Sequence, residues 1–177
     1  MPAPLAVVHD YPIGRALTVS FQRYAAPTTG VVRALPASLG ALPLALIGGS
    51  ALLAAPDGEA YWIGLVPVPD AEPTSVGAIA TLRSGERIDL ITGAAPADRP
   101  HRIAGTWHAI VGIPRGDGSW LALGGTRPVR ALEFHTGRGV EPAGRVMVLG
   151  APAFTALTGH RVAPLDESSG YGGWRLP

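Results

Sequence analysis

One pair of side chains in this sequence has the types and spacing to do chemistry. Glu133 and His135 are two residues apart, and side chains at that spacing on a β-strand point to the same face. A carboxylate beside an imidazole could bind a metal ion or move a proton. His101 and His108 are seven residues apart, so a hairpin could bring them together. A zinc site needs more ligands in fixed geometry than one such pair supplies, so we expect no metal site and no cofactor.

Other catalytic patterns are poorly supported. Ser50 follows Gly48 and Gly49, but it lacks the second glycine of a nucleophile elbow, and no strand-to-helix turn follows it. The glycine patterns that open a nucleotide-binding helix, Gly-x-x-x-x-Gly-Lys and Gly-x-Gly-x-x-Gly, do not occur in a suitable context. We therefore expect a noncatalytic protein, in which Glu133 and His135 come nearest to an enzyme site.

Tryptophans suggest a second kind of site. Trp62, Trp107 and Trp120 recur in apolar strands near turns, and flat aromatic faces can stack on sugar rings. The same residues could instead fill a core, because Trp buries a large area. A carbohydrate-binding module is therefore an alternative function, with a glycan as its ligand.

Charge is scarce throughout the chain. Charged residues make up 15% of the sequence, against about 25% in an ordinary soluble domain. There is no Lys, no Asn and a single Gln, which a GC-rich genome could also explain. With 14 basic and 13 acidic residues the net charge is +1, so nothing favours nucleic acid as a partner. A surface so poor in charge exposes apolar area, which usually marks an interface with other protein subunits.

Both ends of the chain could supply such contacts. Residues 1–14 are interpreted as an N-terminal arm, with Tyr11 and Ile13 as contact residues. The glycine-rich C-terminus offers Tyr171, Trp174 and Leu176, which have too few neighbours in the sequence for a local core. The leading hypothesis is a structural subunit of a larger assembly, such as a phage-like virion or an envelope complex, with homo- or hetero-oligomeric contacts.

Neither a leader nor a membrane span is expected. The start has no basic segment and reaches Asp10 before an apolar stretch can form, so no signal peptide is recognised and the compartment stays unknown. Residues 34–56 carry no charge. Pro36, Pro43 and the Gly48-Gly49 pair would interrupt a membrane helix, and the alternation of apolar residues indicates a buried hairpin instead.

The elements that must position these residues are strands. The 24 Gly and 18 Pro interrupt almost every window that could form a helix. Cysteine is absent, and 177 residues suffice for a core without disulfides. We predict strands at residues 5–8, 16–24, 31–35, 42–47, 51–54, 60–68, 76–83, 87–92, 106–113, 119–123, 129–135, 145–149 and 154–157. The predicted division is an arm (1–14), a β domain (15–137), and a β-hairpin with a flexible tail (138–177).

An internal repeat shapes the predicted fold. Apolar strand patterns close on Gly49, Gly93 and Gly137, which are 44 residues apart each time. Trp62 and Trp107 occupy matching places upstream of the last two, at a spacing of 45. About three 44-residue units would give an all-β antiparallel sandwich or barrel, with a β-trefoil as the alternative. Chance similarity between β segments could also produce this pattern.

One segment resembles a known family. The Trp-x-Ala-x-Val-Gly-Ile-Pro signature is typical of the β-rich domain that precedes the catalytic domain in some M23-type zinc endopeptidases of the bacterial envelope, and the sequence matches it at Trp107-His108-Ala109-Ile110-Val111-Gly112-Ile113-Pro114. With the weaker copy at Trp62, the likeness covers residues 59–93 and 105–137. The metal motifs of the peptidase, His-x-x-x-Asp and His-x-His, do not occur in this sequence. The resemblance therefore implies a noncatalytic scaffold, and a hydrolase-associated accessory domain is a further alternative.

Overall fold

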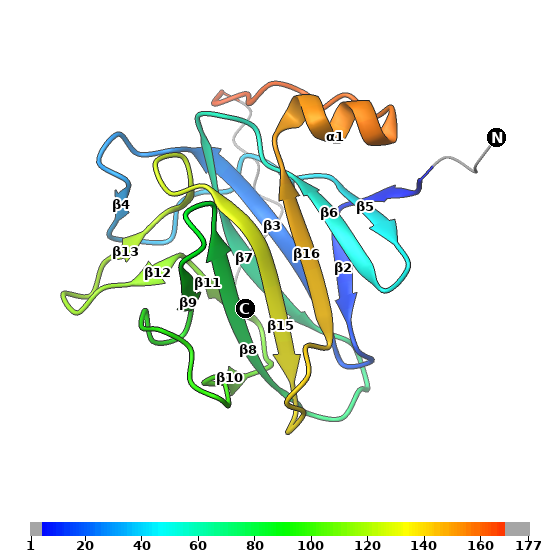
Figure 1. Cartoon of the computed structure of the whole chain (residues 1–177), viewed down its shortest axis with the longest axis vertical. Helices are drawn as coiled ribbons and strands as arrows, with labels where there is room; N and C mark the ends of the chain where they lie inside the picture. Colours follow the sequence, from blue (N-terminus) through cyan, green and yellow to red (C-terminus); the bar gives the residue numbers. More distant parts are fainter. Residues whose placement is uncertain (1–4, 169–177) are drawn as a thin grey trace.

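The computed structural model describes residues 5–168, which are mostly β-strand with one short helix (Figure 1). The prediction of an all-β chain is confirmed. The main sheet contains β1 (Val7–Val8), β5 (Leu44–Ile47), β6 (Ser50–Ala54), β16 (Gly144–Leu149), β15 (Val129–Thr136), β8 (Ser75–Leu82) and β10 (Ile103–Ala104) in that order, and β9 (Arg87–Asp89) pairs with β8. The second sheet contains β11 (His108–Ile110), β7 (Glu59–Pro67), β3 (Leu17–Ala25) and β2 (Asp10–Ile13), and β14 (Leu123–Gly124) pairs with β7. A small third sheet contains β12 (Ile113–Pro114), β13 (Trp120–Leu121) and β4 (Val31–Val32).

The two larger sheets lie one over the other and enclose the main core (Figure 1). Alternate residues of each strand point inward. Phe21 of β3 meets Phe134 of β15 across the core, with ring centroids 6.4 Å apart, and Tyr61 of β7 meets the edge of the Phe21 ring at 5.8 Å. In the described part of the chain none of the three sheets closes into a barrel, so the barrel alternative is wrong.

Pairing within the main sheet corrects the antiparallel prediction at one place. β16 runs parallel to β6, with Val146 opposite Ala51, and antiparallel to β15. A chain that returns to a strand far back in the sequence can enter the sheet in either direction, and here the main sheet is mixed. Because β16 lies between β6 and β15, residues 144–149 belong to the main sheet and not to a separate C-terminal hairpin unit.

The segment predicted as a strand at residues 154–157 lies in the helix α1 (Ala151–Thr158). Pro152 stands in the first turn, where its missing N–H costs nothing. Gly159 ends the helix with φ 74°, a left-handed conformation that glycine adopts freely. Phe154 is fully buried against Ala45 and Ala54, so α1 covers one part of the main sheet.

Glycine with positive φ occupies the tight turns of two hairpins. Gly85 (φ 91°) closes the hairpin between β8 and β9, and Gly118 (φ 78°) closes the hairpin between β12 and β13. Residues 44–54 form the hairpin expected for the uncharged stretch; Leu44 and Leu53 are fully buried, whereas the tip at Ile47 is 46% exposed. No helix in residues 5–168 is long and apolar enough to cross a membrane.

The strands follow the predicted repeat at some positions and depart from it at others. Residues 50–54 form β6, whereas residues 94–98, one unit later, form no strand. The 44-residue repeat, with the β-trefoil that it allows, stays a prediction from the sequence.

Candidate functional site

Glu133 and His135 lie side by side on the outer face of β15, where they line a polar groove of about 350 Å³. Glu133 Oε2 accepts a hydrogen bond from Arg87 Nη2 at 2.5 Å, and Glu133 Oε1 lies 3.7 Å from Arg145 Nε. Both oxygens of this carboxylate are therefore engaged by guanidinium groups. The pair predicted to share a face does so, but Glu133 takes part in an ion-pair network.

His135 is 4% exposed, and its Nδ1 lies 3.1 Å from the carbonyl oxygen of Val140. A carbonyl only accepts, so Nδ1 carries the hydrogen and Nε2 is left as an acceptor. Nε2 has no hydrogen-bond partner among the described residues. Burial lowers the pKa of His135, which keeps the ring neutral at pH 7.

His101 and His108, which a hairpin could have brought together, have different surroundings in the structure. His101 Nδ1 lies 3.2 Å from Asp89 Oδ2, whereas His108 is exposed on β11. Within residues 5–168 no group of three or more His, Asp or Glu is placed to hold a metal ion.

Asp89 has a role that the repeat pattern did not reveal. It precedes Glu133 by 44 residues and so matches it in the repeat, but its side chain is fully buried. Its Oδ1 accepts the backbone N–H of Ile91 at 2.8 Å, and its Oδ2 accepts the backbone N–H of His101 at 3.0 Å. Asp89 thus fixes the loop of residues 90–101. The sequence did contain a signal for this role, namely an Asp at the end of a strand and shortly before Thr-Gly. Such a carboxylate often accepts hydrogen bonds from the N–H groups of the next turn.

The three tryptophans do not form one platform. Trp62 is 1% exposed, lies in a second apolar cluster on the outer face of the second sheet, and donates from Nε1 to the carbonyl oxygen of Pro36 at 3.0 Å. Trp62 therefore cannot stack on a sugar. Trp107 is 43% exposed, and Trp120 is half-buried beside the same cluster.

Two of the predicted contact residues are core residues of this chain. Ile13 is fully buried, and Tyr11 is 5% exposed with its hydroxyl donating to the carbonyl oxygen of Gly49 at 2.8 Å. They lie on β2, which pairs with β3, so the chain from Val7 onward belongs to the fold and is no free arm. The predicted tail anchors, Tyr171, Trp174 and Leu176, lie outside the described residues.

An apolar groove of about 290 Å³ runs along β11, the edge strand of the second sheet. We define the β11 groove by β11 and by apolar side chains on its two sides. Ile91 and Ile103 pack against the main core on one side of β11, and Trp120 packs against the outer cluster on the other side. Leu35 also lines the groove. Its walls therefore flank both faces of the edge strand.

The outer edge of β11 has no backbone partner in the part of the chain that the structure describes. Apart from the ladder with β7, no backbone hydrogen bond of the described residues involves His108, Ala109 or Ile110. Proline occupies two other edges: Pro12 in β2 and Pro114 in β12. Proline cannot donate to a ladder, and the main sheet ends in two-residue strands, so these edges are poor templates for pairing. No local sequence signal marks β11 as an edge strand.

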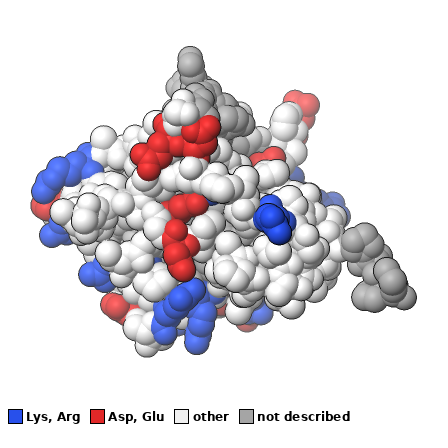
Figure 2. Space-filling view, turned by 90° about the horizontal axis from the view of Figure 1, so that it is seen from above, with Lys and Arg blue, Asp and Glu red and all other residues white. Residues whose placement is uncertain are grey.

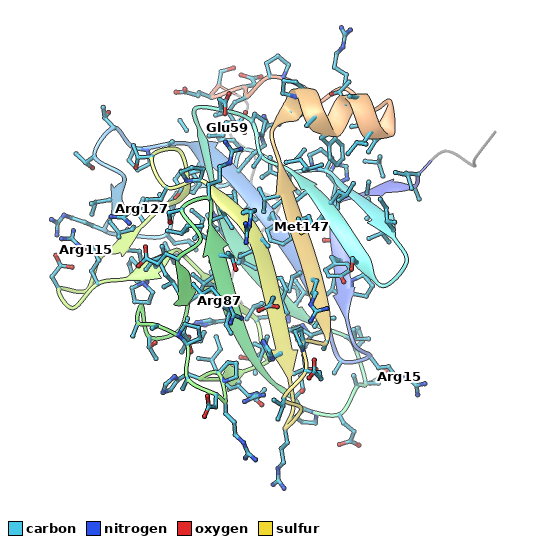
Figure 3. All side chains as sticks on the ribbon, viewed as in Figure 1. Arg15, Glu59, Arg87, Arg115, Arg127 and Met147 are labelled. Carbon is cyan, nitrogen blue, oxygen red and sulfur yellow. The ribbon has the colours of Figure 1, made fainter. Side chains whose placement is uncertain are left out.

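A buried ion pair lies at one end of the two sheets, where Glu59 is seen in Figure 3. Arg23 Nε donates to Glu59 Oε2 at 2.8 Å and Arg23 Nη2 to Oε1 at 2.5 Å, with side chains 8% and 9% exposed. Arg23 Nη2 also donates to the carbonyl oxygen of Ala163 at 3.0 Å. This pair thereby holds the segment that follows α1.

The surface agrees with the low charge of the sequence. Seen from above, large areas carry no charged side chain (Figure 2). Several large apolar side chains are exposed, among them Met147 on β16 (Figure 3) and Leu157 on α1, at 45% and 62%.

Comparison of the chain with models of known protein families, with curated proteins and with solved structures gave no match.

Proposed function

We propose that this protein is a noncatalytic subunit of a larger assembly and that it binds an extended apolar segment of a partner protein along β11. The observation that supports this best is the open edge of β11 between two apolar walls. A phage-like virion or a multi-subunit envelope complex would supply such a partner, and a hydrolase-associated accessory domain would use the same surface. All three settings are proposals that follow from the low charge and from the resemblance at Trp107–Pro114.

Strand addition explains why both walls are apolar. A segment that pairs with β11 forms backbone hydrogen bonds that are independent of its sequence. Its side chains then alternate between the two faces of the sheet. One set would meet Ile91 and Ile103, and the other would meet Trp120. The groove therefore favours a segment with apolar residues on both sides.

Selection of peptides on the full-length chain tests this function. A displayed library of random nine-residue peptides should yield binders rich in apolar residues, and Ile91→Glu should weaken their binding by roughly tenfold or more. Leu35→Glu, at a position that is 39% exposed, is a second groove variant that leaves the core intact. Leu157→Glu is the matched control, because it makes the same change at an exposed apolar residue on α1 and should leave binding unchanged.

Circular dichroism spectra should show that all three variants keep the fold. The proposal is wrong if selection enriches no peptide, or if the enriched peptides bind the two groove variants as tightly as the unchanged chain.

A further inference from the structure

We infer that the segment bound in the β11 groove is residues 169–177 of a neighbouring copy, so that copies join head to tail. This inference rests on the proposed function, because it names the partner of the same groove.

The composition of residues 169–177 suits the groove. The segment is Ser-Gly-Tyr-Gly-Gly-Trp-Arg-Leu-Pro, with apolar side chains at Tyr171, Trp174 and Leu176. In an extended segment Trp174 and Leu176 point to one side, and Tyr171 points to the other with Arg175. Both apolar walls of the groove would then receive a large side chain. The long Arg175 side chain can keep its charge in water at the end of the groove, which is lined by no carboxylate.

The length of the segment is also sufficient. Nine residues span up to about 30 Å when extended, whereas pairing with the three residues of β11 takes about 10 Å. The remaining residues can bridge two copies. Glycines next to Tyr171 and Trp174 carry no side chain and allow the backbone to approach the groove walls closely.

The scarcity of charge favours a neighbour over the segment's own copy, because exposed apolar area usually marks an interface between subunits. Ala163 is held by Arg23 of β3 at one end of the two sheets, and β7 separates β3 from β11. Ala163 is thus fixed beside β3, two strand positions from β11. Each copy can insert its own C-terminal segment into one neighbour and receive the segment of another, which is a heterologous interface that gives rings or filaments.

Complementation between two full-length variants tests the inference. The tail variant carries Trp174→Ser and Leu176→Ser and keeps the groove; the groove variant carries Ile91→Glu and keeps the tail. Sedimentation velocity over a range of concentrations should show oligomers for the unchanged chain and for Leu157→Glu. Each variant alone should be monomeric. A mixture of the two variants should form a one-to-one dimer and nothing larger, because only one intact groove and one intact tail can meet.

Each other outcome overturns the inference. A mixture that stays monomeric while the unchanged chain assembles, or a tail variant that assembles as the unchanged chain does, excludes the exchange of tails. A result in which the unchanged chain is monomeric at every concentration also overturns the inference. Binding of the tail in the groove of its own copy would give this result. If displayed peptides still require the intact groove in any of these cases, the proposed function stands and only the partner is wrong. If the groove variants change neither peptide binding nor assembly, both fail.

Discussion

Removal of the carboxylate charge at Glu59 should destabilise the fold strongly. Glu59 accepts two hydrogen bonds from Arg23, and both side chains are less than a tenth exposed. In Glu59→Gln the shape of the side chain is kept, but the guanidinium of Arg23 stays buried without a counter-charge. An uncompensated charge in the interior is costly, because the interior solvates ions much less well than water does.

The free energy of unfolding is expected to fall by about 3 kcal/mol. This value lies at the lower end of the range for breaking a buried ion pair, because the amide of Gln still accepts one hydrogen bond from Arg23. For a domain of this size such a loss lowers Tm by about 6 to 12 °C. Replacement of both partners, as in Arg23→Met with Glu59→Leu, removes the buried charges together. That double variant should lose less stability than Glu59→Gln alone.

Urea unfolding followed by circular dichroism measures these free energies, with differential scanning calorimetry for Tm. Glu133→Gln is the matched control, since it makes the same change in the pair with Arg87, whose side chain is 51% exposed. It should cost less than about 1 kcal/mol, as exposed pairs do. Equal losses for Glu59→Gln and Glu133→Gln would refute the reasoning, and so would a double variant that is less stable than the single one.

Three further predictions concern backbone fit and buried polar groups. Gly77→Ala would place a Cβ 2.5 Å from the carbonyl oxygen of His101 and should cost about 1 to 3 kcal/mol in urea unfolding, whereas Gly49→Ala, with nothing within 4 Å, should be nearly neutral. Asp89→Asn turns an amide N–H toward a backbone N–H, so hydrogen exchange should quicken in residues 90–101 at a cost of about 1 to 3 kcal/mol. Burial raises the pKa of Tyr24 from 10.0 to about 12. The folded chain holds this proton more tightly than the unfolded chain, so the free energy of unfolding should fall as the pH rises from 10 to about 12, and less so in Tyr24→Phe.

Local pattern was enough to predict the strands that lie in the middle of sheets. The predicted strand at 129–135 matches β15 (Val129–Thr136), and that at 76–83 matches β8 (Ser75–Leu82) within one residue. Such strands have apolar runs bounded by turn residues, and both signals are local. The strand predicted at 154–157 failed because apolar residues over four positions suit a helix as well, and Pro152 with Gly159 marked the two helix ends.

The environment of each tryptophan could not be predicted, because it depends on pairing between distant segments. Trp62 and Trp107 occupy similar local sequences, with an apolar run and a proline after each. Trp62 lies on β7, which has neighbours on both sides, whereas Trp107 precedes the edge strand β11. The first is therefore buried and the second is 43% exposed. The same argument applies to Tyr11, whose burial follows from the pairing of β2 with β3.

The open edge explains how a chain with so little charge could associate in a defined way. An apolar surface alone would let copies aggregate in many orientations, and the exposed apolar side chains are scattered over several elements. Backbone pairing imposes a direction and a register, which side-chain contacts on a smooth surface do not. Proline in β2 and β12 removes donors from two competing edges, and the short strands β1 and β10 limit two more. If the proposed function is right, strand pairing takes place at β11, where the apolar walls select the segment that pairs.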